Sequence, residues 1–282
     1  MPTFQQALKI NEQYAIDNNK EPSAIKLLML HFSCLNSANL VAKLNDEMDE
    51  GTYKKFLRAV DEYIINNKPV QYITENEFFY GYKFNVNNCV LIPRFETEEL
   101  VTNVLELKNE YFQERKVKLV DIGTGSGCLA IALALEDQTI EAHGTDISEE
   151  ALAVAKENND TLHANVTFYH GDMLEPVNNQ KFDILVSNPP YIPNGEHVAP
   201  LVKDYEPHIA LFGGEDGLDY YRKIIIGAES ILNDRYIIAF EHAFDKSKEI
   251  KRLIKKYLKN IRIIQKKDMQ GKDRMTFVLK KD

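Results

Sequence analysis

The chain has 282 residues and an ordinary globular composition, 44% hydrophobic and 27% charged, which allows one large domain or one large and one small. No apolar run approaches the roughly 18 residues of a membrane helix and no signal-peptide pattern is present, so we expect no membrane association. The net charge of −9 argues against stable binding to nucleic acid phosphates. The three cysteines, Cys34, Cys89 and Cys128, are far apart in the sequence, and the histidines are not clustered. This pattern predicts neither disulfides nor a metal site, and it favours a reducing, cytoplasmic location.

The first 67 or so residues have the spacing of helices. Thr3 and Gln6 form the pattern of a capping box, which predicts the start of a first helix. Pro22 and Ser23 begin a second helix, and apolar residues at helical spacing predict a third over residues 52–66. We therefore expect residues 1–68 to form a small N-terminal helical domain.

Residues 69–93 differ in character from the helical segment. Residues 70–73 and 78–86 are rich in aromatic and β-branched side chains, and turn-type residues interrupt them. This composition predicts strands or a β-hairpin, which would form a bridge between two domains. A helix follows from about Glu96, and residues 94–282 would form the second domain.

From residue 117 onward, strand and helix patterns alternate. Strands are predicted at residues 117–122, 139–145, 165–170, 182–187, 235–241, 260–266 and 274–280. Helices fit residues 127–136, 148–158, 217–230 and 246–258. This alternation predicts an α/β fold with a Rossmann-like, seven-stranded and mostly parallel sheet that has helices on both faces. Ligands bind such sheets at the carboxyl ends of the strands.

The C-terminal part of the chain is basic, unlike the rest. Residues 246–282 carry 14 lysine and arginine residues against 4 aspartate and glutamate residues, so the acidic charge lies in residues 1–245. The basic segment could contact RNA or an acidic protein. A solvated helix face with charged strand ends is the interpretation that we favour.

A glycine-rich loop follows the first predicted strand of the sheet. Gly123, Gly125 and Gly127 permit positive φ and the close approach of a ligand, with Thr124 and Ser126 between them. Their spacing differs from the dinucleotide fingerprint G-x-G-x-x-G/A and resembles the loop of class I methyltransferases. A tight turn without a ligand is the alternative interpretation.

Asp146 ends the next predicted strand, 23 residues after Gly123. Its carboxylate could accept hydrogen bonds from both hydroxyls of a ribose, although it could also cap the helix that begins near Ser148. The loop and this carboxylate together predict an adenosyl cofactor. In the same superfamily, the segment at 171–173 brackets an adenine ring, on which Met173 could pack, whereas a surface turn with a core methionine is the alternative.

Asn188-Pro189-Pro190-Tyr191 follows the buried-type strand at 182–187. The Asn188 side-chain oxygen and the Pro189 carbonyl could accept the two N–H groups of a planar amide or aryl amine, and Tyr191 could stack on it. Two acceptors would hold the nitrogen and favour a lone pair that faces a methyl donor, so positioning would supply most of the acceleration without a strong base. A lone Asn-Pro would be a turn that closes a strand.

Longer motifs lie between about residues 69 and 222, with weaker matches at 271–274. They are Pro69-Val70-Gln71-Tyr72-Ile73, Val90 to Arg94 with Glu96-Thr97-Glu98, Asp121 to Ala132, Phe182 to Pro193, Tyr205 to His208 and Ala210 to Leu218. On these residues the chain resembles the peptide chain release factor N5-glutamine methyltransferases (the PrmC/HemK family). The N-terminal helices fit the substrate-recognition domain of that family by position and character.

The resemblance implies transfer of a methyl group from S-adenosyl-L-methionine to the glutamine amide in the Gly-Gly-Gln motif of class 1 release factors, which modulates translation termination. By motif, the cofactor would contact Gly123, Thr124, Gly125, Ser126, Gly127, Asp146, Met173 and Asn188. The glutamine amide would contact Asn188, Pro189, Pro190 and Tyr191. Arg94 and Glu96 lie in a family signature, and they could close the cofactor side or form a structural ion pair.

Two positions depart from the family pattern, and two other functions compete. Phe95 stands where a second proline is usual, and Glu241-His242-Ala243 replaces Glu-x-Gly. An adenine-N6 methyltransferase acting on DNA or RNA could use the same tetrapeptide on a flipped base, but the acidic body and the lack of an added target-recognition domain argue against it. A non-catalytic partner subunit that retains the fold is the alternative of another class.

Overall fold

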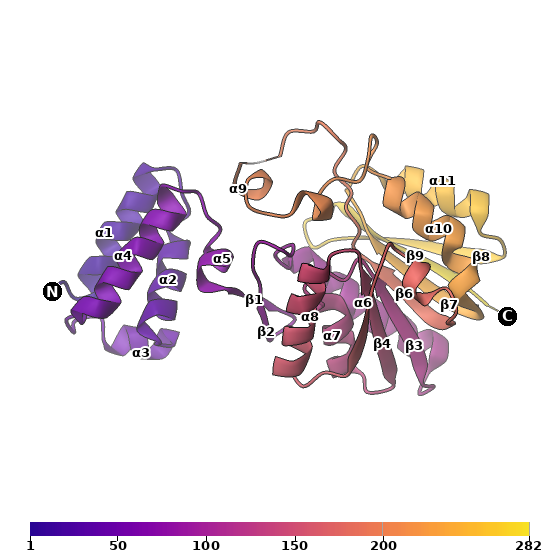
Figure 1. Ribbon diagram of the computed structural model, residues 1–282, viewed down its shortest axis with the longest axis horizontal. Helices are drawn as coiled ribbons and strands as arrows, with labels where there is room; N and C mark the ends of the chain where they lie inside the picture. The colour runs from indigo at the N-terminus through magenta and orange to yellow at the C-terminus, as the bar shows by residue number, and fades with distance from the viewer. Residues whose placement is uncertain (199, 282) are drawn as a thin grey trace. The chain divides into compact units, whose positions relative to one another are not determined.

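The computed structural model describes residues 1–198 and 200–281, which divide into two compact units (Figure 1). The helical unit contains residues 1–76 together with 200–205. The α/β unit contains residues 77–198 and 206–281. The return of the chain to the helical unit at 200–205 has no signal in the sequence pattern.

The helical unit is built around one apolar core. Its helices are α1 (Phe4–Asp17), α2 (Ser23–Ser33), α3 (Ser37–Ala42), α4 (Glu50–Ile64), α5 (Val70–Thr74) and α9 (Pro200–Lys203). Ile25 and Leu28 of α2 pack with Phe56 of α4, and all three are fully buried. The predicted capping box is confirmed, because Thr3 Oγ1 accepts from the Gln6 amide at 3.2 Å and Gln6 Oε1 accepts from the Thr3 amide at 3.0 Å.

The expected strand at residues 70–73 is wrong, because this segment is the short helix α5. Pro69 precedes its first residue, and Val70 packs in the core of the helical unit. Burial of these apolar side chains against helices overrides their β propensity. The hairpin lies just beyond, as β1 (Asn76–Phe79) and β2 (Tyr82–Asn85). The helices α3 and α9 are too short to leave a periodic signal.

The α/β unit contains the expected seven-stranded sheet. Its strands are β3 (Val117–Ile122), β4 (Ile140–Asp146), β5 (Val166–His170), β6 (Phe182–Ser187), β7 (Leu232–Glu241), β8 (Ile261–Lys267) and β9 (Asp273–Lys280). They lie in the order β5-β4-β3-β6-β7-β9-β8, with β9 antiparallel to both neighbours and the other pairs parallel. The strand order reverses at β3 and β6, which is where doubly wound sheets bind ligands.

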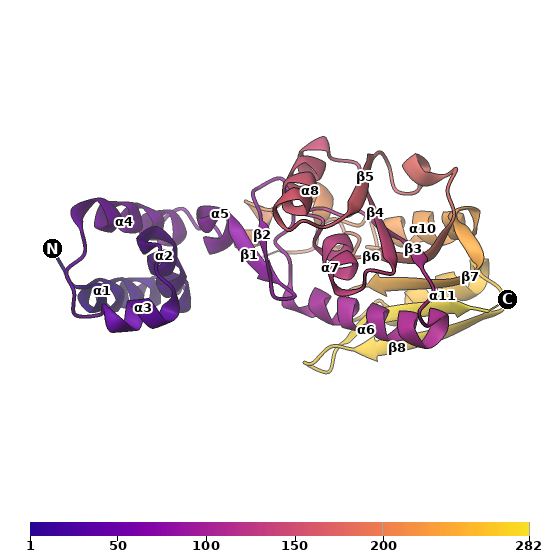
Figure 2. The same cartoon turned by 90° about the horizontal axis from the view of Figure 1, so that it is seen from below.

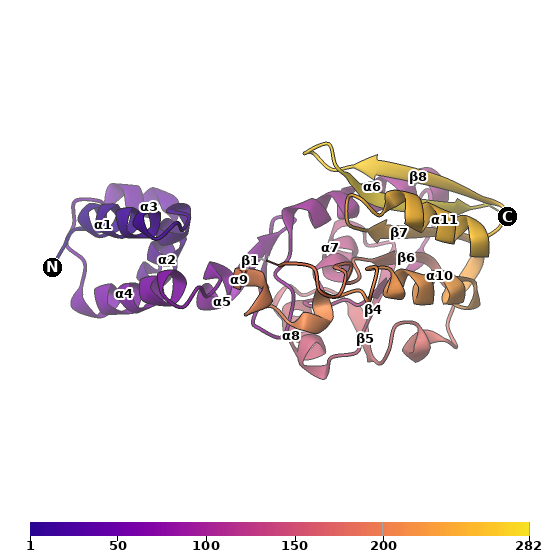
Figure 3. The same cartoon turned by 90° about the horizontal axis from the view of Figure 1, so that it is seen from above.

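Helices cover both faces of this sheet, as Figures 2 and 3 show from opposite sides. They are α6 (Phe95–Phe112), α7 (Cys128–Glu136), α8 (Glu149–Thr161), α10 (Asp219–Ile231) and α11 (Ser247–Tyr257), with short 3₁₀ turns at Glu175–Val177 and His208–Ala210. Alternate strand residues separate into two cores: Leu119 packs with α6 and α7, whereas Val120 packs with α10 and α11. Within the described residues, no helix has both the length and the apolar character needed to span a membrane.

Phe56→Ala should destabilise the helical unit by about 3–5 kcal/mol, because it removes a fully buried ring from the core. Hydrogen exchange in peptides from α1, α2 and α4 measures this loss as faster exchange. Phe78→Ala is the matched control, since that ring is 63% exposed and its loss should cost less than about 0.5 kcal/mol. Equal effects of the two substitutions would contradict the assignment of this core.

Candidate active site

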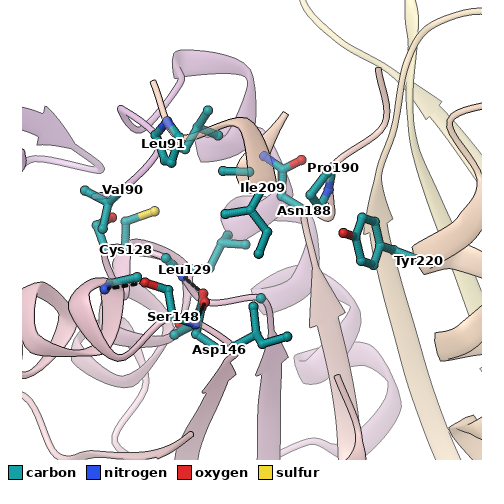
Figure 4. A pocket seen from close by; sticks show the side chains of 18 of the residues that line it. Val90, Leu91, Cys128, Leu129, Asp146, Ser148, Asn188, Pro190, Ile209 and Tyr220 are labelled. Carbon is teal, nitrogen blue, oxygen red and sulfur yellow. Dashed lines mark hydrogen bonds between the residues drawn. The ribbon is translucent and has the colours of Figure 1, made fainter. Parts of the chain in front are cut away.

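Loops that leave the carboxyl ends of four parallel strands meet around one pocket (Figure 4). Residues 123–126 follow β3, and Asn188 with Pro190 follow β6. Asp146 ends β4, and Ile147 and Ser148 follow it. Asp172 and Met173 follow β5. Most of the predicted site residues therefore line this pocket. The three that do not line it are Gly127, Pro189 and Tyr191.

The glycine loop is held against β4 by its backbone. The amides of Gly123 and Thr124 both donate to the Thr145 carbonyl at 2.9 Å. Gly127 is the N-cap of α7 and has a φ of +81°, and an added Cβ would lie 3.0 Å from Ile131 Cδ1 and 3.2 Å from Ala155 Cβ. Gly127 therefore sets the packing of α7 behind the loop, while the rest of the loop faces the pocket.

Asp146 joins the glycine loop to the segment that follows β4. Its Oδ2 accepts from the Gly125 amide at 2.8 Å, and its Oδ1 accepts from the Ser148 amide at 3.0 Å. Ser148 Oγ accepts from the Ala151 amide, so Ser148 rather than Asp146 is the N-cap of α8. Burial raises the pKa of Asp146, against the effect of these backbone bonds. Each carboxylate oxygen retains acceptor capacity for a hydroxyl group.

Met173 is positioned on the pocket wall by its backbone. Its carbonyl accepts from Thr145 Oγ1 at 2.9 Å, and its φ of +48° places it in the left-handed region. The neighbouring Asp172 forms an ion pair with Lys223 of α10, with 2.9 Å between Oδ2 and Nζ. Tyr220 and Lys223 complete this side of the pocket.

Asn188 is the first residue after β6, and its Nδ2 donates to Thr97 Oγ1 at 3.3 Å. Within residues 1–198 and 200–281, no hydrogen-bond donor contacts Asn188 Oδ1 or the Pro189 carbonyl oxygen. Tyr191 packs against the core under α10, and burial raises its pKa to about 12. Its hydroxyl therefore stays protonated near neutral pH, and it cannot serve as a base there.

Arg94 forms its ion pair with Glu206, not with Glu96. Glu206 is buried and also accepts from the Ile92 amide, so the pair ties the segment before α6 to the segment after α9 on the pocket rim. The sequence did not reveal this partner, because the two residues are 112 positions apart. Phe95, one of the departures from the family pattern, is exposed and lies outside the pocket lining.

A glycine-rich segment at 213–217 packs directly on the Pro190–Tyr191 backbone, a contact that the sequence motif did not predict. The Gly213 amide donates to the Ile192 carbonyl at 2.8 Å. A Cβ at Gly213 would lie 2.4 Å from the Pro190 carbonyl oxygen, and one at Gly217 would lie 2.3 Å from the Tyr191 carbonyl oxygen. Only glycine allows this approach, which holds the segment after Asn188 in place.

These features define the class of protein. A doubly wound sheet with an antiparallel β9 between β7 and β8, a glycine loop after its first strand and a carboxylate after its second is the architecture of a class I methyltransferase. The fold matches the crystal structure of a methyltransferase from Pyrococcus furiosus, with a TM-score of 0.53 and 17% identity over 82% of this chain and 98% of the other.

Sequence comparison narrows this class. The family models that match are the PrmC N-terminal domain at residues 7–74 and the methyltransferase small domain at residues 99–204. The release factor glutamine methyltransferase of Bacillus cereus is 40% identical over 96% of this chain and 97% of its own length. That of Bacillus subtilis is 41% identical over 97% and 96%. The chain belongs to the release factor glutamine methyltransferase family.

Gly217→Ala should lower the rate of methyl transfer by about tenfold or more, because the new Cβ displaces the Tyr191 carbonyl and the adjoining Asn188 segment. Gly81→Ala is the matched control: its φ of +80° is close to the +77° of Gly217, but an added Cβ would meet nothing within 4 Å. Steady-state rates of the two variants separate contact from backbone strain. Equal losses would mean that the contact with Tyr191 is unimportant.

Proposed function

We propose that the pocket residues bind S-adenosyl-L-methionine and transfer its methyl group to the side-chain amide nitrogen (N5) of the glutamine in the Gly-Gly-Gln motif of class 1 peptide chain release factors, which modulates translation termination. The observation that carries the proposal is that Asn188 lines the same pocket as the glycine loop, with its Nδ2 bonded to Thr97, in a chain of this family. The names of the relatives state the release factor and the glutamine. The chain is an S-adenosylmethionine-dependent methyltransferase.

The residues on the pocket wall suit an adenosyl group. Asp146 would accept from the ribose hydroxyls, since both of its oxygens are already oriented by backbone amides. Gly123, Thr124, Gly125 and Ser126 would approach the methionine part closely, with Gly127 setting the packing behind them. Met173 would pack on the adenine. When bound, the sulfonium group supplies an electrophilic methyl group.

The chain's own contribution to the reaction is to hold the acceptor amide. Asn188 Oδ1 and the Pro189 carbonyl oxygen would each accept one N–H, which orients the nitrogen lone pair toward the cofactor side of the pocket. Pro190 closes the wall. Tyr191 lies outside the pocket lining and packs against the core under α10, so its position does not support the predicted stacking of its ring on the amide plane. No basic side chain is needed, because the nitrogen loses its proton after the methyl group has been transferred.

The helical segment has a separate proposed role. We assign residues 1–68 to recognition of the release factor, residues 69–93 to a bridge, and residues 94–282 to methyl transfer. The match of residues 7–74 to the PrmC N-terminal domain supports a separate N-terminal domain, although the compact helical unit extends to residue 76. We also infer a cytoplasmic location and no stable nucleic acid or membrane partner, in keeping with three free cysteines and an acidic body.

Incubation with methyl-labelled cofactor and a bacterial class 1 release factor tests the proposed reaction. We expect label in the wild-type release factor and none in a factor whose Gly-Gly-Gln glutamine is replaced by alanine. Label in DNA or RNA without label in the release factor would identify an adenine-N6 methyltransferase instead. Cofactor binding without turnover on any of these would identify a non-catalytic subunit.

Asn188→Ala and Asp146→Ala should fail in different ways, so each serves as the control for the other. Asn188→Ala removes one acceptor of the amide, and it should lower kcat by about 100-fold with nearly unchanged cofactor affinity. Asp146→Ala should raise the Kd for the cofactor by about tenfold or more, because it removes the acceptor of the ribose hydroxyls. Calorimetry and single-turnover rates measure the two effects; a normal kcat or a normal Kd, respectively, contradicts the assigned role.

A further inference from the structure

Three side chains from three elements form a hydrogen-bonded series behind the acceptor site. Asn188 Nδ2 lies 3.3 Å from Thr97 Oγ1, and Thr97 Oγ1 lies 2.7 Å from Glu241 Oε2. Asn188 follows β6, Thr97 lies in the first turn of α6, and Glu241 is the last residue of β7. Thr97 and Asn188 line the pocket, whereas Glu241 does not, so Glu241 can act on the site only through the other two.

The chemistry of the three groups gives this series a direction. An ionised carboxylate only accepts hydrogen bonds, so Thr97 must direct its one hydroxyl proton at Glu241. The Thr97 oxygen then offers only lone pairs to Asn188, which can face it with Nδ2 but not with Oδ1. Asn188 Oδ1 is thereby directed away from Thr97 and left for another donor.

Glu241 is built rigidly into the fold. It is 2% exposed, its backbone pairs with Met275 of β9, and its carbonyl accepts from the Tyr221 hydroxyl at 2.6 Å. A buried carboxylate is costly unless hydrogen bonds or opposite charges compensate it. Thr97, also buried at 3% exposed, donates a hydrogen bond to it, and the Asn188 side chain also interacts with this carboxylate and lowers its pKa.

We propose that Thr97 and Glu241 are positioning residues that fix the orientation of the Asn188 side-chain amide, so that Oδ1 and not Nδ2 faces the glutamine of the release factor. The inference rests on the proposed function, because it assigns a cause to the orientation that the amide clamp requires. The Oδ1 and Nδ2 ends of the Asn188 amide differ little in shape, so hydrogen-bond direction alone selects between the two orientations.

Protonation of Glu241 would remove this selection. A protonated Glu241 can donate to Thr97 Oγ1, and the hydroxyl proton of Thr97 is then free to donate to Oδ1 of a reversed Asn188 amide. Burial raises the pKa of Glu241 to about 7, Thr97, Asn188 and Arg274 lower it, and Glu96 raises it. The other titratable groups near it are Tyr191, Tyr221, Cys128 and His242. The productive orientation should therefore be lost as pH falls below neutrality.

Substitution of Thr97 tests the series in the full-length enzyme with a release factor as substrate. Thr97→Val keeps the shape of the side chain but removes donor and acceptor, and it should lower kcat by about tenfold with less than about twofold change in the Kd for S-adenosylmethionine. Thr97→Ser keeps the hydroxyl and should restore most of the rate. Thr102→Val, an exposed position on the same helix, is the matched control and should leave kcat unchanged.

The outcomes separate this inference from the proposed function. Full activity of Thr97→Val, or no recovery in Thr97→Ser while both bind the cofactor normally, overturns the positioning role. If Asn188→Ala is fully active, the amide clamp itself is wrong, whatever Thr97 does. An inactive Asn188→Ala beside a fully active Thr97→Val overturns only the positioning role.

A pH profile provides the readout that a purely structural role would not change. At saturating cofactor, wild-type kcat should rise with pH through the neutral range, because Glu241 must lose its proton to order the series. Glu241→Gln can still accept from Thr97 through its amide oxygen but cannot ionise, so its kcat should be nearly constant from about pH 6 to 8. A flat wild-type profile, or a rise that survives in Glu241→Gln, overturns the role given to Glu241.

Discussion

The parallel pairing of β3 with both β4 and β6 is the constraint on which the site depends. Asp121 stands beside Gly144 on one side and Val186 on the other, so the three strands end at the same edge of the sheet. Ser187 Oγ donates to the Ile122 carbonyl at 2.6 Å, which joins the ends of β6 and β3 just before the two functional loops begin. The glycine loop and the tetrapeptide that begins at Asn188 are far apart in the sequence, and they become neighbours because two strands are in register.

Two buried carboxyl groups, those of Asp121 and Glu241, lie next to residues that line the pocket. Burial raises the pKa of Asp121, which precedes the glycine loop, and of Glu241, which ends β7, to about 7 each. Between roughly pH 4 and 7 the folded chain therefore holds protons that the unfolded chain has released, so these groups make the fold less stable as pH rises through that window. Strongly shifted pKa values are common among the titratable groups of functional sites. Here both carboxyl groups bond to residues that line the pocket, Asp121 to Thr124 and Glu241 to Thr97.

Much of the architecture was predictable because it depends on local periodicity. All seven strands of the sheet were expected within a few residues, since each is a short apolar run between turn or helix signals. The failures occurred where tertiary burial competed with propensity. Residues 70–73 look like a strand by composition, yet they form α5 because Val70 packs in a helical core. The segment 200–205 joins the helical unit although its neighbours belong to the α/β unit.

The sequence by itself determined the kind of chemistry, because residue types and spacing within one loop are local properties. The glycines at 123–127, Asp146 and the tetrapeptide beginning at Asn188 indicate a methyl donor and a planar acceptor nitrogen. Only the tertiary structure decided how those groups are held. Glu206 as the partner of Arg94, Gly217 against Tyr191, and Thr97 with Glu241 behind Asn188 join residues far apart in the chain. Hydrogen-bond direction and close approach depend on distances in space, which spacing along the sequence does not encode.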